Sequence, residues 1–167
     1  GVVFLMVSGL LWFYSATYKK QFLVGNIIVA LLTAFVPLMV VFFEIAAIYN
    51  YYGSELVSTS AIRIIFYWVA GYAAFAFLTT LSREIVKDIE DFEGDRAYGS
   101  RSLPVVAGIN ASKAVVSALI ALTIVLMIVM WALYIKDMIS LLYILLAAVI
   151  PLFFGLLLLI RSTSTDR

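Results

Sequence analysis

Hydrophobic residues in this chain are arranged in long uninterrupted runs, and polar residues are confined to the short segments between them. Five runs of about 20 residues contain no charged side chain, which is typical of membrane-spanning helices. They are Val2–Tyr18, Phe22–Phe43, Ile64–Ser82, Ala114–Ile135 and Met138–Ile160. At about 1.5 Å per residue each can cross most or all of a hydrocarbon core, the first only marginally. The pattern predicts an all-α, polytopic transmembrane helical bundle with five spans.

Two prolines fall inside predicted spans. Pro37 lies in the second span and Pro151 in the fifth. Proline removes a backbone donor, and membrane helices tolerate this when neighbouring groups satisfy the freed carbonyl. We therefore expect a kink near each proline.

Composition supports a membrane protein and excludes several chemistries. Hydrophobic residues make up 65% of the 167 residues and charged residues 13%, whereas soluble domains have roughly 45–50% and about 25%. The net charge of +1 gives no indication of a nucleic-acid partner. The chain has no cysteine and no histidine, which excludes disulfides, typical zinc sites and a Ser-His-Asp triad. Carboxylates, Lys, Arg and hydroxyl groups remain for chemistry.

The basic residues predict the orientation of the bundle. Of the eleven Lys and Arg residues, only Arg63 and Lys136 fall on one side of the predicted spans, and the other nine fall on the opposite side. The positive-inside tendency makes the nine-residue side cytoplasmic. We therefore expect an integral protein of a prokaryotic cytoplasmic membrane, with the loop 83–113 facing the cytoplasm. The chain shows no signal-peptide pattern at Gly1, and it is expected to be part of a longer protein.

The loop 83–113 concentrates the charge. Ten of the 21 charged side chains lie between Arg83 and Arg101. If the third span continues as a helix through this segment, at about 100° per residue, four carboxylates share one face. They are Glu84, Asp88, Asp91 and Asp95, whereas Glu90 and Glu93 project elsewhere. Like charges at this spacing repel unless a cation lies between them.

The kind of ligand predicts the kind of cation. Oxygen donors alone, at a semi-exposed helix end, favour Mg²⁺, which keeps water and bridges to substrate phosphates. Lys87 and Arg101 flank the acids and could hold diphosphate oxygens. Gly94 permits a turn, so that Asp95 could leave the helical face. The competing interpretation is a solvated loop whose mixed charges keep the helix end in water.

These residues resemble a known family. The pattern Asp88-x-x-Asp91-x-x-Gly94-Asp95 resembles the second aspartate-rich motif of the UbiA-type intramembrane prenyltransferases. Its flanking residues agree: Arg83, Glu84 and Lys87 before it, and Ser102, Leu103 and Pro104 after it. A second stretch resembles the loop between the fourth and fifth helices of the family: Tyr14, Ser15, Lys19 or Lys20, Gly25 and Asn26. The resemblance extends over essentially the whole chain.

The resemblance implies a nine-span bundle of which this chain contains the fourth to eighth helices. It implies that Asp88, Asp91 and Asp95 hold Mg²⁺ against a polyprenyl diphosphate. Diphosphate-binding roles fall to Lys19, Lys20, Lys87 and Arg101, and catalytic or substrate-orienting roles to Tyr14, Asn26 and Glu84. The family's first aspartate motif has no counterpart in this chain, so half of the metal ligands are expected from elsewhere and the chain alone is expected to be inactive.

The implied activity is Mg²⁺-dependent transfer of a polyprenyl group to an acceptor. The form REIxKDIEDxxGD resembles the branch that alkylates geranylgeranylglyceryl phosphate, in lipid biosynthesis. Prenylation of an aromatic acceptor of the 4-hydroxybenzoate or naphthoate type is an alternative. CDP-alcohol phosphotransferases are also membrane-bound and use Mg²⁺, but their Asp-Gly-x-x-Ala-Arg signature is missing. A non-enzymatic membrane assembly or transport subunit is the alternative of another class.

Overall fold

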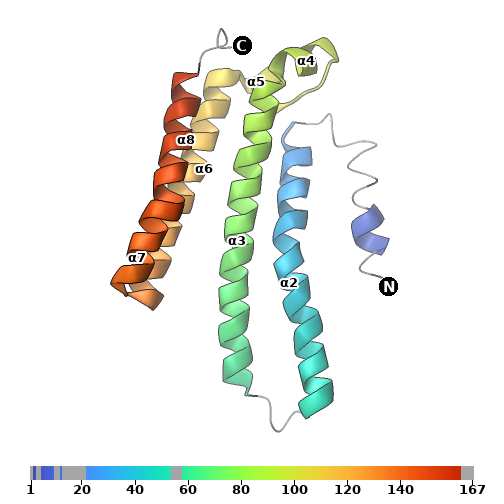
Figure 1. Ribbon diagram of the computed structural model, residues 1–167. Helices are drawn as coiled ribbons and strands as arrows, with labels where there is room; N and C mark the ends of the chain where they lie inside the picture. Colours follow the sequence, from blue (N-terminus) through green and yellow to red (C-terminus); the bar gives the residue numbers. More distant parts are fainter. Residues whose placement is uncertain (1, 3–4, 10–11, 13–21, 54–57, 163–167) are drawn as a thin grey trace.

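The computed structural model describes residues 2, 5–9, 12, 22–53 and 58–162 (Figure 1). This part of the chain contains helices and no strands. The long elements are α2 (Val24–Tyr52), α3 (Thr59–Glu90) and α6 (Ile109–Met130). Two short helices, α4 (Phe92–Ala97) and α5 (Leu103–Ala107), connect α3 to α6. The last span contains α7 (Met138–Ile144), the π-helical segment η3 (Leu145–Val149) and α8 (Ile150–Arg161).

Within the described residues, four helical segments are long and apolar enough to cross a membrane: Val24–Tyr52, Thr59–Glu90, Ile109–Ile135 and Met138–Arg161. The third of these includes the π-helical segment η2 (Trp131–Ile135) at its end. They correspond to the second to fifth predicted spans, so the predicted all-α polytopic bundle is confirmed. The first predicted span, Val2–Tyr18, lies mostly outside the described residues and stays a prediction.

Two helices extend well beyond the predicted apolar runs. α2 continues past Phe43 to Tyr52, and α3 continues past Ser82 to Glu90. The predicted loop 83–113 therefore begins as two further turns of helix, and α4 and α5 occupy much of the remainder. Apolar runs locate the part of a helix that contacts hydrocarbon, whereas its hydrogen-bond ladder continues through polar residues until a bend interrupts it.

The two prolines are accommodated differently. Pro37 lies inside α2 without interrupting it. Pro151 lies in the first turn of α8, where a missing N–H is tolerated, and η3 immediately precedes it. A π-helical turn is a common local adjustment at such a position.

α3 is the central helix, with α2 on one side and α6 and α8 on the other (Figure 1). Small buried residues, Ala30 and Ala34 on α2 and Ala73 on α3, allow close helix packing. A cluster of buried side chains joins α3, α5 and α6 through Ile85, Leu103 and Val116. This cluster lies at the end of the bundle that carries the charged segment, and it fixes the positions of the elements there.

Two unusual backbone positions shape this end of the bundle. Gly108, between α5 and α6, has a φ of 88°, a conformation that side-chain-bearing residues rarely adopt. Leu23, immediately before α2, has a φ of 54°, which costs about 1–2 kcal/mol for a residue with a side chain. Leu23 also packs against the cluster of Ile85, Leu103 and Val116. That packing offsets the backbone cost and sets where α2 begins.

The ends of the helices agree with the predicted grouping of basic residues. The ammonium group of Lys113, near the start of α6, donates hydrogen bonds to the backbone carbonyl of Ser162 and, at 3.0 Å, to its hydroxyl. The start of α6 and the end of α8 are therefore at the same end as α4 and α5 (Figure 1). Arg63 and Lys136 belong to the opposite ends of α3 and of the α6–η2 segment. That the α4–α5 end is cytoplasmic stays a prediction.

Candidate functional site

A side-chain hydrogen bond links α2 to the acidic segment. The amide Nδ2 of Asn26 donates to Oδ2 of Asp88 over 2.7 Å, and the two residues are 62 positions apart in sequence. Both side chains are half-buried. The bond connects the first turn of α2 to the last turns of α3, and it places one predicted metal ligand against one predicted orienting residue.

Asn26 occupies a position on the buried face of α2. At about 100° per residue, Ala30 and Ala34 fall within about 80° of it, on the side that packs against α3. A polar side chain on such a face needs a hydrogen-bond partner. Because a carboxylate can only accept, the amide presents its N–H group to Asp88.

Asp88 is surrounded by further charge. The carboxylates of Asp95 and Glu84 both lie near enough to repel Asp88, and the ammonium group of Lys87 attracts it. Glu84 also forms an ion pair with the neighbouring Arg83, at 3.6 Å. The carboxylates of Glu84 and Asp95 therefore lie within electrostatic range of Asp88. We call Glu84, Asp88 and Asp95 the Asp88 face.

Asp91 departs from this arrangement. α3 ends at Glu90, and Asp91 stands at the bend before α4 with a ψ of 8° and an exposed side chain. Gly94 was the expected position of the turn, and Asp95 the acid expected to leave the face. The bend instead comes three residues earlier, and Asp95 stays near Asp88. Within the described residues, no group of three or more acidic side chains is close enough to hold a metal ion. That Asp88, Asp91 and Asp95 together hold Mg²⁺ stays a prediction.

The Asp88 face fits Mg²⁺ in the kind of its ligands but supplies few of them. All its donors are carboxylate oxygens, which suit a hard cation. Mg²⁺ is commonly held by one or two protein carboxylates, with water and substrate phosphate completing six ligands. Oδ2 of Asp88 already accepts from Asn26, and Oδ1 forms no hydrogen bond with the described residues. The donor set is therefore compatible with a metal that is bound together with a diphosphate.

Arg101 lies on the other side of the start of α2. With Phe22, Val24 and Val106 it lines a cavity of about 490 Å³. Val24 is two residues from Asn26, so Arg101 and Asp88 flank the same helical turn. The neighbouring Ser102 hydroxyl is buried and has no hydrogen-bond partner within the described residues. A cation, an unpaired hydroxyl and the amide groups of a helix start are all suited to an anion.

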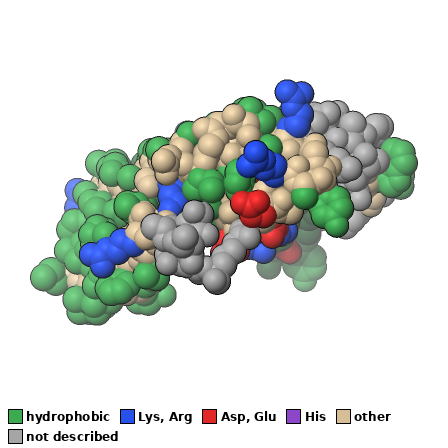
Figure 2. Space-filling view, turned by 90° about the horizontal axis from the view of Figure 1, so that it is seen from above, with side chains coloured by type: hydrophobic (Ala, Val, Ile, Leu, Met, Phe, Trp, Pro, Cys, Tyr) green, Lys and Arg blue, Asp and Glu red, His purple; other side chains and the backbone are tan. Residues whose placement is uncertain are grey.

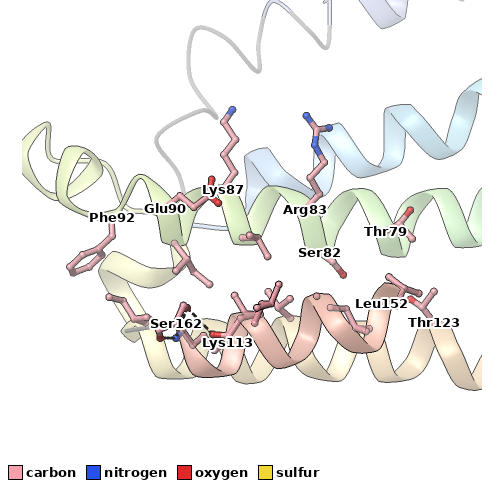
Figure 3. A pocket seen from close by; sticks show the side chains of 18 of the residues that line it. Thr79, Ser82, Arg83, Lys87, Glu90, Phe92, Lys113, Thr123, Leu152 and Ser162 are labelled. Atoms are coloured by element: carbon pink, nitrogen blue, oxygen red, sulfur yellow. Dashed lines mark hydrogen bonds between the residues drawn. The ribbon is translucent and has the colours of Figure 1, made fainter. Parts of the chain in front are cut away.

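The opposite face of α3 borders a larger cavity of about 1000 Å³, which we call the α6–α8 cavity (Figure 3). Val116, Ile120 and Leu159 line its apolar part, and Lys113 lies at its charged end. Arg83 and Lys87 border it from α3, but their side chains extend away from α6 and α8. On a helix of about 100° per residue, the residues of α3 that line it are centred about 180° from Asp88.

The α4–α5 end seen face-on carries both signs of charge (Figure 2). Acidic side chains lie toward its middle, and Lys and Arg side chains are distributed around them. Of the other predicted site residues, Tyr14, Lys19 and Lys20 lie outside the described residues, whereas Lys87 is exposed beside Asp88. Sequence reasoning did not pair Asn26 with Asp88, and no signal in a single sequence links residues so far apart.

Comparison with known proteins identifies the family of the chain. The chain matches the UbiA prenyltransferase family over residues 1–167. The chain therefore belongs to the UbiA prenyltransferase family, and its four apolar helices make it an integral membrane protein. No solved structure matches the chain.

Several curated relatives share one name. A digeranylgeranylglyceryl phosphate synthase of Methanosphaera stadtmanae is 34% identical over 154 residues, which are 92% of this chain and 48% of that protein. The synthase of Thermococcus sibiricus is 38% identical over 104 residues, or 62% of this chain and 30% of that protein. The synthase of Pyrococcus furiosus is 43% identical over 108 residues, or 64% and 32%. The chain spans about a third to a half of the length of these relatives.

Proposed function

We propose that the complete protein to which this chain belongs transfers a prenyl group from a prenyl diphosphate to geranylgeranylglyceryl phosphate, in a Mg²⁺-dependent reaction. The family supports prenyl transfer, and the names of the relatives support the lipid acceptor. The observation that carries the proposal is the Asp88 face. Like charges gathered at a half-buried helix end are destabilised without a cation, and Mg²⁺ with a diphosphate supplies one.

The proposed roles place the metal ligands on the Asp88 side of the first turn of α2 and the diphosphate-binding Arg101 on its other side. Asp88 and Asp95 hold Mg²⁺, with Asp91 adding a carboxylate at the bend between α3 and α4. Arg101 and Lys87 neutralise diphosphate oxygens, as Lys19 and Lys20 do from the segment before α2. Glu84 and Tyr14 orient the substrate. The remaining ligands come from parts of the complete protein that are not in this chain.

The proposed chemistry is a substitution at an allylic carbon. The carbon–oxygen bond of the prenyl diphosphate breaks, and its electron pair leaves with the diphosphate. When bound, Mg²⁺ stabilises the charge that develops on those oxygens. Arg101 and Lys87 stabilise the same charge. The acceptor hydroxyl then forms an ether bond with the allylic carbon and releases its proton to water at the polar interface.

The proposed setting is a prokaryotic cytoplasmic membrane with the α4–α5 end in the cytoplasm. That end carries most of the basic residues, as expected for a cytoplasmic side. The apolar helix faces suit a substrate whose isoprenoid chain lies among hydrocarbon while its diphosphate stays at the polar interface.

The test uses the complete protein in membranes with radiolabelled geranylgeranyl diphosphate, Mg²⁺ and a panel of lipid and aromatic acceptors. We expect label to enter the lipid product only with geranylgeranylglyceryl phosphate. The double variant Asp88→Ala/Asp91→Ala should abolish the transfer, and Glu93→Gln should retain it as a matched control. Transfer to an aromatic acceptor instead would overturn the proposed acceptor. No transfer, with donor binding unchanged in the double variant, would overturn the enzymatic function and favour an assembly or transport subunit.

A further inference from the structure

We propose that Asn26 is a positioning residue that orients the Asp88 carboxylate for the metal, without contacting substrate itself. The inference rests on the proposed function, since it concerns the metal of that reaction. Its observation is the 2.7 Å hydrogen bond from Nδ2 of Asn26 to Oδ2 of Asp88. The bond occupies one carboxylate oxygen, and the other forms no hydrogen bond within the described part of the chain.

The bond restricts the part of Asp88 that is otherwise loose. The terminal torsion of an aspartate side chain is broad, so helix packing fixes where the carboxylate lies better than how it is turned. A hydrogen bond to one oxygen fixes that rotation. Asn26 is itself held on the buried face of α2, where Gly25 and Ala30 are buried beside it. The orientation of Asp88 is therefore set by the packing of α2 on α3.

The chemistry of the donor matters as much as its position. A Lys or Arg at position 26 would form a stronger bond but would also neutralise the carboxylate and repel a cation. A neutral amide orients Asp88 and leaves its full negative charge available. Ligating carboxylates in metal sites are commonly held by such outer hydrogen bonds, and removing the partner typically weakens metal affinity about 10–100-fold.

The hydrogen bond also opposes the repulsion between Asp88 and the neighbouring carboxylates. Asp95 and Glu84 repel Asp88, so an unrestrained carboxylate would turn away from them toward solvent. The bond to Asn26 holds it beside these acids. Asn26 thereby preserves the arrangement of like charge that a divalent cation would stabilise.

The test separates orientation from packing with three variants of the complete protein. Asn26→Leu keeps the number and branching of side-chain heavy atoms without a donor, Asn26→Gln keeps the amide, and Asn110→Ala removes an exposed asparagine of α6 as a control. Mn²⁺ binding is followed by electron paramagnetic resonance with inorganic diphosphate present. Thermal unfolding of each variant in detergent is recorded alongside.

We expect Asn26→Leu to weaken Mn²⁺ binding about 10–100-fold, with partial recovery in Asn26→Gln and no change in Asn110→Ala. In steady-state assays the Mg²⁺ concentration for half-maximal rate should rise by a similar factor, while the rate at saturating Mg²⁺ changes less. Wild-type affinity in a folded Asn26→Leu variant would overturn the positioning role alone. Should Asn26→Leu fail to fold, wild-type Mn²⁺ affinity in a folded Asn26→Ala variant, which also lacks the donor and adds no charge, would overturn it equally. No Mn²⁺ binding by the wild-type protein would overturn the metal-dependent function together with this inference.

Discussion

The two faces of α3 differ although they share one charged segment. Toward α2 lies the Asp88 face, formed by Glu84 and Asp88 of α3 with Asp95 of α4, where a hydrogen bond fixes one carboxylate and two others repel it. Toward α6 and α8, α3 borders a cavity of about 1000 Å³ whose deeper wall is apolar. Glu90 and Glu93 belong to that second side. A high density of acid therefore does not by itself define a site, and the helical face of each acid decides which of them can act together.

The largest effect is expected on the rate of prenyl transfer when the charge of Asp88 is removed. Asp88→Asn keeps the size of the side chain and removes its charge, so we expect prenyl transfer by the complete protein to fall more than about 100-fold, beyond the range of outer hydrogen-bond partners. Glu93→Gln removes one charge on the α6–α8 side and should leave the rate within about twofold. Initial rates of label transfer measure both. Equal losses in the two variants would show that total charge matters and the face does not.

The next largest effect is expected on stability, from the buried cluster of Ile85, Leu103 and Val116. Ile85 is fully inaccessible to solvent, and Ile85→Ala should destabilise the protein by about 2–5 kcal/mol, as for buried aliphatic truncations in general. Ile65, near the start of α3, is exposed, and Ile65→Ala is the matched control with little expected effect. Thermal or denaturant unfolding in detergent measures the difference. Identical unfolding of the two variants would contradict the assignment of this cluster as the core of the α4–α5 end.

A smaller effect is expected on the cavity side alone. Lys113→Met removes the hydrogen bonds to the carbonyl and hydroxyl of Ser162, each contributing about 0.5–1.5 kcal/mol in typical cases. We expect faster hydrogen exchange at the end of α8 and unchanged Mn²⁺ affinity at the Asp88 face. Weakened metal binding in this variant would show that the two faces are coupled, contrary to their separation by α3.

The smallest effect lies at the far end of the bundle, where Asp137 precedes α7. Its carboxylate accepts a 2.6 Å hydrogen bond from the backbone N–H of Ser140, which lowers the pKa of Asp137 below its usual value. The folded state therefore favours the charged form, and this contribution is present above the unfolded pKa and lost as pH falls through the folded pKa. An asparagine side chain caps a helix without titrating, so Asp137→Asn should reduce the acid sensitivity of the thermal midpoint slightly. Parallel pH profiles for the two proteins would contradict the cap.

Much of the fold follows from the sequence because apolar runs of membrane length have few alternatives to helices. The second to fifth spans were predicted in order. The bounds of the fifth agree with the structure to within one residue, whereas α2 and α3 continue about eight or nine residues past the predicted ends of the second and third spans. α3 continues through the charged residues from Arg83 to Glu90. The hydropathy pattern marks only where contact with hydrocarbon ends, and it does not indicate where the helix itself ends. The spacing of Glu84, Asp88 and Asp95 also predicted a shared face, since helical periodicity extends through Glu90 and resumes after one bend.

The unpredicted parts of the site depend on tertiary packing. Ideal helical geometry would place Asp91 on the same face as Asp88, but the bend at Asp91 exposes its side chain. The turn expected at Gly94 comes three residues earlier, at Asp91. The bond between Asn26 and Asp88 depends on how α2 begins at Val24 and packs on α3. Neither property is encoded in a local pattern, because both result from contacts between segments distant in sequence.

The most direct test of the central claim is the dependence of donor binding on Mg²⁺. Geranylgeranyl diphosphate would be titrated into the complete protein, wild type and Asp88→Asn, with Mg²⁺ and with a chelator. The Asp88 face predicts that Mg²⁺ strengthens donor binding of the wild type at least about tenfold, equivalent to about 1.4 kcal/mol, and that Asp88→Asn loses this gain. Equal donor affinity with and without Mg²⁺, or an undiminished gain in Asp88→Asn, would contradict the assignment of the Asp88 face as a metal–diphosphate site.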